Sequence, residues 1–168
     1  MPSLAIAKAG KDDAVTLATL CAEHACYEQL PACPVDHAQR LHALLERQEA
    51  ILHAWIAWNR GEAVGYAAAT IDVATLSGTR YLHLDCLYLV ERWRARGIGR
   101  QLFEVVAAFA RAQGVAEIQW QTPDWNHGAI RFYQGLGASM QAKQRFILRQ
   151  GNSINNVNNA ERQRCKIN

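Results

Sequence analysis

The residues best suited to chemistry form a short turn from Arg94 to Arg100, which reads RARGIGR. The turn lies between a predicted strand and a predicted helix, so it meets the first backbone N–H groups of that helix, which have no acceptor within the helix. The helix dipole is positive at this end, and Gly97 and Gly99 let a ligand come close to the main chain. A pyrophosphate fits such a turn.

Two common phosphate-binding motifs are excluded for this turn. A dinucleotide-binding fingerprint needs Gly or Ala three residues after Gly99, where this chain has Leu102. A P-loop needs Gly-Lys-Ser/Thr, which the sequence lacks. A tight turn with solvated arginines is the alternative that these residues alone leave open.

The elements around the turn alternate between strands and helices. Apolar spacing, Pro31, Pro34 and the turns at Asn59-Arg60-Gly61 and Ser77-Gly78 predict the order βααβββαβαβ. Hairpins come first and βαβ crossovers later, so we expect an α/β fold with a mixed sheet covered by helices. The predicted strands are Ser3–Ala9, His53–Trp58, Glu62–Val73, Arg80–Val90, Glu117–Gln121 and Ala138–Leu148, and the predicted helices are Asp12–Glu28, Asp36–Gln48, Gly97–Gln113 and Asn126–Leu136.

Length and composition limit the class of protein. The 168 residues fit one domain, which we place at 1–148, followed by a polar, Asn-rich tail at 149–168. With 50% hydrophobic and 20% charged residues, the body of the chain is not intrinsically disordered. No apolar run approaches the roughly 20 residues of a membrane helix, and the start lacks a signal-peptide core. The five cysteines form no CxxC pair, which argues against a disulfide framework or a zinc site and favours the cytoplasm.

The net charge of +3 is unevenly distributed. Residues 1–79 carry five Lys/Arg against nine Asp/Glu, whereas residues 80–148 carry nine against five. The two halves could serve ligands of opposite sign, although chance variation over solvated surfaces is the simpler reading of charge alone. Nucleic acid is disfavoured, because the arginines gather at one turn and not along a helix face.

Two spaced motifs resemble the GNAT superfamily of acetyl-CoA-dependent N-acetyltransferases. Its phosphate motif, Gln/Arg-x-x-Gly-x-Gly/Ala, is matched by Arg94, Gly97 and Gly99. Its second signature, Asn-x-x-Ala-x-x-Phe-Tyr with a later Gly-Ala, is matched by Asn126, Ala129, Phe132, Tyr133, Gly137 and Ala138. Within the superfamily the chain is most similar to the spermidine/spermine (diamine) acetyltransferase branch, through Ala25-Cys26-Tyr27-Glu28, Tyr81-Leu82 and Trp125-Asn126.

The resemblance implies the GNAT fold over residues 3–148, with a mixed, mostly antiparallel sheet that splays between its fourth and fifth strands. The pantetheine arm of acetyl-CoA, the acyl donor, then lies in the gap and pairs with the edge of the fourth strand. No metal is implied. The residues implied to hold acetyl-CoA are Leu87, Tyr88, Leu89, Arg94, Ala95, Arg96, Gly97, Ile98, Gly99, Arg100, Asn126 and Tyr133.

The resemblance also implies a general acid. Tyr133 follows Asn126 by seven residues, which is two turns along one helix face. The family role of this tyrosine is to protonate the departing CoA thiolate, and ordinary pKa values of ~8.5 for a thiol and ~10 for a phenol allow that transfer. A core tyrosine with a satisfied hydroxyl is the alternative.

The amine nucleophile must first lose a proton, which costs about 4 kcal/mol at pH 7 for a pKa near 10. Side chains alternate along a strand, so we expect His83, Asp85, Leu87 and Leu89 to share one face, with His83 and Asp85 toward the acceptor channel. Many family members carry Glu at the position of His83. Either His83 or Asp85 is therefore the candidate base, and Asp85 is also a candidate anchor for a cationic acceptor.

The acceptor site implied by the family lies at the first two helices, with Tyr27, Glu28, Asp36 and Asp85 as candidate contacts. Together with the acidic first half, they favour a small cationic amine that attacks acetyl-CoA directly in a ternary complex. The alternatives are an acetyltransferase of aminoglycoside-type antibiotics or protein amines, and a non-catalytic acyl-CoA-binding module. The family implies a homodimer. From the charge pattern and the lack of a long apolar run we expect neither nucleic acid nor a membrane as a partner. The tail ERQRCKIN resembles the translated ends of integron gene cassettes.

Overall fold

The computed structural model describes residues 4–47 and 51–148. The tail at 149–168 lies outside the described residues, so its resemblance to integron cassettes stays a prediction. The chain divides into two compact units, Met1–Gln121 and Thr122–Asn168, and each is described by itself.

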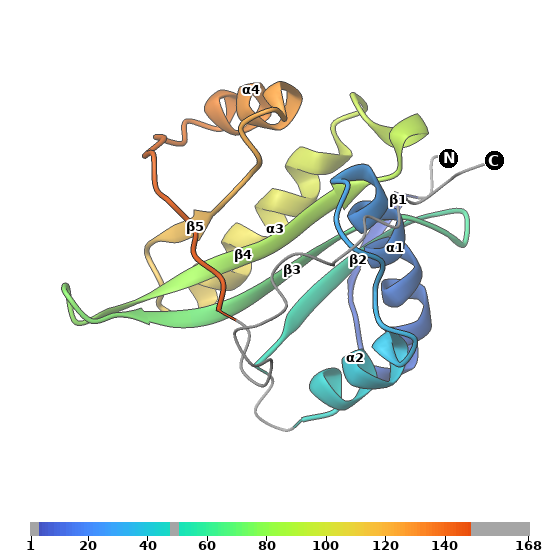
Figure 1. The fold of residues 1–168 in the computed structure, drawn as a ribbon. Helices are drawn as coiled ribbons and strands as arrows, with labels where there is room; N and C mark the ends of the chain where they lie inside the picture. The colour runs from blue at the N-terminus through green and yellow to red at the C-terminus, as the bar shows by residue number, and fades with distance from the viewer. Residues whose placement is uncertain (1–3, 48–50, 149–168) are drawn as a thin grey trace, which may run out of the picture. The chain divides into compact units, whose positions relative to one another are not determined.

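The first unit is built on a five-stranded sheet with the order β1-β2-β3-β4-β5 (Figure 1). The first four strands pair antiparallel with their neighbours, and β5 runs parallel to β4. The predicted mixed, mostly antiparallel sheet is therefore confirmed. Its strands are β1 (Leu4–Lys8), β2 (His53–Asn59), β3 (Glu62–Ala74), β4 (Thr79–Leu89) and β5 (Ile118–Trp120).

Helices cover both faces of this sheet. Helix α1 (Ala14–Tyr27) and helix α2 (His37–Leu45) pack on one face, where α1 contributes Leu17 and Leu20 to a core that includes Tyr66 of β3. Helix α3 (Ile98–Ala112) packs on the other face through Leu102 and Val106, whose spacing of four residues gives the helix one apolar stripe. Two short 3₁₀ helices, η1 (Lys11–Asp13) and η2 (Glu91–Trp93), precede α1 and α3. No helix within the described ranges is long and apolar enough to cross a bilayer.

The second unit contains helix α4 (His127–Gly135), the predicted last helix. The predicted strand Ala138–Leu148 differs from the structure, in which these residues form no regular element. Phe146, Ile147 and Leu148 are exposed there. A strand is defined by its hydrogen-bonded neighbour, and an apolar pattern alone does not supply one.

At Gly65, β4 lies so close to β3 that a side chain has no room, and we predict that Gly65→Ala destabilises the protein. Gly65 pairs with Leu89, and a Cβ at position 65 would lie 2.5 Å from the Tyr88 carbonyl oxygen and closer still to the Leu89 side chain. Backbone cannot move aside without opening the ladder, so the free energy of unfolding should fall by about 1–3 kcal/mol. Chemical denaturation would measure it.

Gly10→Ala is the matched control. Gly10 has a negative φ, and the nearest atom to an added Cβ is 4.0 Å away, so the change should stay within about 0.5 kcal/mol. Equal denaturation midpoints for the two variants would contradict the close approach.

Candidate active site

Strand β4 contains a bulge at Asp85. Ala68 pairs with Cys86 and Ala69 with Leu84, so Asp85 is an extra residue opposite β3. On the other side, the register between β4 and β5 runs only from Leu82 to Leu84. A bulge bends and twists its strand, and the two parallel strands part at this point. This separation agrees with the splay expected between the fourth and fifth strands.

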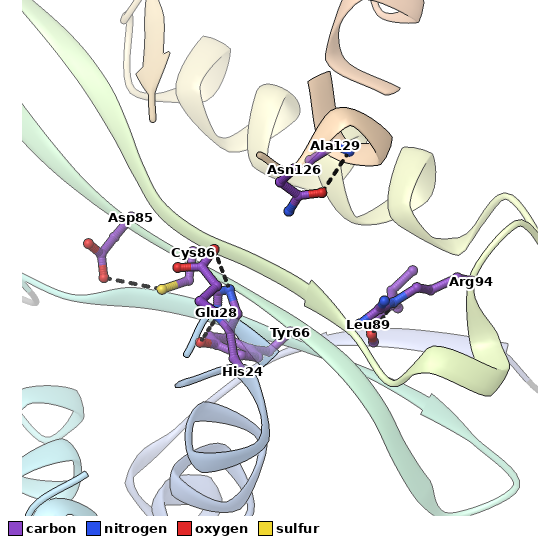
Figure 2. A network of polar contacts seen from close by, with 9 residues as sticks. All are labelled: His24, Glu28, Tyr66, Asp85, Cys86, Leu89, Arg94, Asn126 and Ala129. Carbon is purple, nitrogen blue, oxygen red and sulfur yellow. Dashed lines mark hydrogen bonds and ion pairs between the residues drawn. The ribbon is translucent and has the colours of Figure 1, made fainter. Parts of the chain in front are cut away.

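The main chain of β4 beyond the bulge presents polar groups to the splayed side. The N–H of Val90 donates to the Val64 carbonyl on β3 at 3.0 Å. Successive residues of a strand direct their N–H and C=O groups to opposite neighbours, so those of Leu87 and Leu89 point away from β3. The Leu89 carbonyl accepts a hydrogen bond from Nε of Arg94 at 3.0 Å (Figure 2). An added ligand strand would therefore be held by Leu87 and by the Leu89 N–H.

The bulge also reverses the side-chain faces of β4. Before it, Leu82 and Leu84 pack in the core on the α3 side, and after it Leu87 and Leu89 do so. His83 lies on the opposite face, which is the face that α1 and α2 cover. The expectation that His83, Asp85, Leu87 and Leu89 share one face is therefore wrong, because one extra residue shifts the alternation.

The turn from Arg94 to Arg100, called the phosphate turn below, has the geometry of an anion site. Ala95 and Gly97 have positive φ values of 58° and 79°, and helix α3 begins at Ile98. Gln101 donates to the Gly97 carbonyl at 3.2 Å, so the N–H groups of residues 98–100 precede the helical ladder. A Cβ at Gly97 would meet nothing within 4 Å, so glycine is needed there for its conformation.

Two arginines of the turn pack on aromatic rings. The guanidinium of Arg96 lies 5.1 Å from the ring centre of Trp93. That of Arg94 lies 4.2 Å from the ring centre of Tyr27, at the end of α1, and 5.7 Å from that of Tyr88. Arg94 thus joins the phosphate turn, the end of α1 and the end of β4, while Arg100 stands exposed in the first turn of α3.

A partly buried polar network links Glu28 to the bulge (Figure 2). His24 on α1 has Nδ1 3.0 Å from the Tyr66 hydroxyl and Nε2 3.2 Å from Glu28 Oε1. Cys86 donates from Sγ to Asp85 Oδ2 at 3.6 Å. Burial raises the pKa of Tyr66 and of Cys86, and the Asp85 charge adds to the effect at Cys86, so both groups stay protonated at neutral pH.

Sequence reasoning identified Glu28 but missed His24 and Tyr66. His24 and Glu28 lie four residues apart, and that helical spacing is a signal that could have paired them. Tyr66 has no such signal, because the register of β3 against α1 cannot be read from the sequence.

A second polar group surrounds His83. Its Nδ1 lies 3.8 Å from Asp72 Oδ2 on β3. Thr70 donates to Asp72 Oδ1 at 3.0 Å, and Tyr81 donates to Asp72 Oδ2 at 3.5 Å. Desolvation and the Asp72 charge raise the pKa of Tyr81, which keeps its phenol a donor. Sequence analysis identified His83 but missed Asp72 and Thr70.

Three other predicted site residues, Asp36, Asn126 and Tyr133, each contact a residue of their own helix. Asp36 precedes α2 without a side-chain capping bond and instead accepts a hydrogen bond from Arg40 at 2.9 Å, which lowers the pKa of Asp36. In the second unit, Asn126 caps α4 by accepting a hydrogen bond from Ala129 N–H at 3.1 Å (Figure 2). Tyr133 is half-buried on the same helix, with its ring centre 5.2 Å from that of Phe132.

Comparison with known sequences agrees with this geometry. The profile of the acetyltransferase (GNAT) family matches residues 17–138. Thialysine N-epsilon-acetyltransferase of Caenorhabditis elegans is 29% identical over 133 residues, which cover 79% of this chain and 81% of that protein. L-ornithine N5-acetyltransferase of Arabidopsis thaliana is 31% identical over 72 residues, so the match spans 43% of this chain and only 32% of that protein. These relatives agree with the expected diamine-type branch.

Solved structures share the fold. An aminoglycoside acetyltransferase from an uncultured soil metagenomic sample, in complex with trehalose, has a TM-score of 0.76 at 17% identity, over 88% of this chain and 97% of that one. An aminoglycoside N-acetyltransferase in complex with CoA has a TM-score of 0.74 at 22% identity, over 89% of this chain and 97% of that one. At these identities the likeness concerns the fold alone, and the expected fold class is confirmed.

Gly97→Ala tests the phosphate turn. The substitution strains a left-handed residue by about 1–2 kcal/mol and disturbs the N–H groups that would face a pyrophosphate. We predict that the dissociation constant of CoA, measured by calorimetry, rises at least tenfold.

Gly114→Ala is a control at the other end of α3. Gly114 has φ 69°, and an added Cβ meets nothing within 4 Å, so the two variants should lose similar stability. Only Gly97→Ala should weaken CoA binding. Equal affinities in both variants would remove the turn from the binding site.

Proposed function

This chain belongs to the acetyltransferase (GNAT) family and is an acetyl-CoA-dependent N-acetyltransferase, and we propose that it acetylates a primary amine of a small cationic acceptor. The observation that carries this proposal is the bulged strand β4. Its open edge at Leu87 and Leu89 lies close in sequence to the glycine turn of α3, and its face toward α1 carries His83 beside Asp72. The proposal includes direct attack in a ternary complex and a cytoplasmic homodimer.

The donor would be held by main-chain groups. Main-chain groups of Leu87 and Leu89 would pair with the pantetheine amides as a strand does, and the N–H groups at the start of α3 would bind the pyrophosphate. Carbonyl oxygens, which only accept hydrogen bonds, could not replace those N–H groups at an anion. Arg94, fixed on the Leu89 carbonyl and the Tyr27 ring, would hold the strand end and the turn in one arrangement.

The acceptor class follows from the charges at the bulge. Asp85 is exposed, Asp72 lies on the same sheet face as His83, and Glu28 ends α1 beside Tyr27. Carboxylates attract an ammonium group more strongly where water is partly excluded. The two relatives described above are named for thialysine and L-ornithine, which supports a short acceptor with a primary amine and a second charge.

The chemistry needs one proton acceptor and one proton donor. An ammonium acceptor loses a proton to His83 or Asp85, and its lone pair then attacks the acetyl carbon while the bond to sulfur breaks. Tyr133 would protonate the thiolate and recover its proton from the acetylated nitrogen. The half-buried position of Tyr133, next to Phe132, is compatible with this role.

An aminoglycoside acceptor is the second candidate, favoured by the fold of the soil-metagenome enzyme. An amine panel separates the candidates. With acetyl-CoA, release of CoA should be at least tenfold more efficient, in kcat/KM, for thialysine, L-ornithine or spermidine than for sisomicin or a peptide with a free N-terminus. Preference for sisomicin would establish the alternative acceptor. Acetyl-CoA binding without transfer to any amine would indicate a binding module.

Tyr133→Phe tests the general acid. Loss of the hydroxyl should lower kcat by about 100-fold or more, because thiolate departure loses its proton donor. The dissociation constant of acetyl-CoA should change less than twofold, and the melting temperature should remain close to that of the parent. A variant with the parent's kcat would exclude this role.

A further inference from the structure

Asp72 and His83 form a pair on the sheet face that α1 and α2 cover. His83 Nδ1 lies 3.8 Å from Asp72 Oδ2, and the exposed fractions of the two side chains are 32% and 40%. The pair is therefore accessible to a small solute. An exposed ion pair contributes only about 0–1 kcal/mol to stability, and such a pair would not require other side chains to hold it in place.

This carboxylate, however, is held in place from both sides. Thr70 donates to Oδ1 at 3.0 Å and Tyr81 to Oδ2 at 3.5 Å. The ladder sets the arrangement, because Thr70 pairs with His83 and Asp72 with Tyr81 across β3 and β4. The contact between Asp72 and His83 is the diagonal of these two pairs, fixed by the strands and not by a mobile loop.

The bulge places His83 on the same sheet face as Cys86 and Tyr88, near the proposed site of acetyl transfer. Because Asp85 is the extra residue, His83 shares its face with Cys86 and lies two residues before the bulge. Without the bulge, His83 would lie on the face opposite Cys86 and Tyr88. The other polar groups on this face near His83 are Tyr81 and Asp85 on β4, and Glu117 and Gln119 along β5, where Gln119 pairs with His83 and donates to Glu117 at 2.7 Å.

We propose that Asp72 is a positioning residue that orients His83 as the general base of the acetyl transfer, an inference that rests on the proposed function. The Asp72 carboxylate, 3.8 Å from Nδ1 of His83, favours the tautomer that carries its proton on Nδ1 and leaves Nε2 as the proton acceptor. Nε2 takes one proton from the acceptor ammonium, and the amine attacks the acetyl carbon as the bond to sulfur breaks. The imidazolium then releases its proton to water, so the net reaction yields amide, CoA thiol and one proton.

Kinetics of the full chain test this pair, with acetyl-CoA and L-ornithine as the probes. Asp72→Asn should lower kcat about 10- to 100-fold and change KM for L-ornithine less than threefold. His83→Gln should lower kcat at least as much as Asp72→Asn does, and the double variant should be no slower than His83→Gln, because the two residues act as one unit.

Two further variants complete the design. Asp72→Glu should recover part of kcat, and Glu46→Gln, which removes an exposed carboxylate paired with Lys11, should keep the parent's kinetics. Additive losses in the double variant, or a loss confined to KM, would overturn the positioning role. Full activity of His83→Gln would overturn it too and leave Asp85 as the base, with acetyl transfer intact.

A readout without turnover separates this inference from the proposed function. If no amine in the panel is acetylated, the proposed function fails, and nitrogen NMR of the His83 ring, which reports which ring nitrogen carries the proton, still tests the pair. The share of the tautomer protonated at Nδ1 should be larger in the parent than in Asp72→Asn at the same pH. Identical tautomer ratios would show that Asp72 does not act on His83.

Discussion

The bulge at Asp85 is the constraint on which the other features of the site depend. Strand β4 must pair with β3 along its whole length, yet it pairs with β5 only from Leu82 to Leu84. One extra residue satisfies both conditions, because it bends the strand away from β5 while the ladder to β3 continues. The same residue frees the main chain of Leu87 and Leu89 on the splayed side and turns His83 toward the α1 face. The main-chain edge proposed to hold the donor and the side chain proposed as the base are thus both set on β4 by a single register shift.

The side chains around β4 hold the strand in place and keep the groups beneath the bulge uncharged. Cys86 and Tyr66 beneath the bulge stay protonated, since burial raises the pKa of both, and His24 ties them to Glu28. Negative charge lies instead on the more accessible carboxylates, Asp85 at the bulge and Asp72 on β3. Arg94 closes the other end of the strand by bonding the Leu89 carbonyl and packing on Tyr27. The turn that follows places helical N–H groups where an anion would lie.

Local patterns in the sequence predicted the fold well. The glycine turn, the amphipathic α3 and the hairpin strands each carry a signal within a few residues, and the structure has them close to their predicted bounds. No pattern in the sequence marks the bulge. Asp85 differs from its neighbours only in having no partner residue on β3, and strand register depends on the partner strand. The face of His83 and its contact with Asp72 were unpredictable for that reason. The strand expected at Ala138–Leu148 failed because its pattern does not specify a neighbour.

Amide hydrogen exchange of the parent protein, with and without CoA, tests the central claim most directly, since it reports on each backbone N–H by itself. Bound CoA should slow exchange at Leu87 and Leu89 and at residues 98–100, while the Val90 N–H, already bonded to Val64, should change little. Slowed exchange confined to other segments, with CoA demonstrably bound, would contradict the account, because the splayed edge and the turn would then not be the donor site.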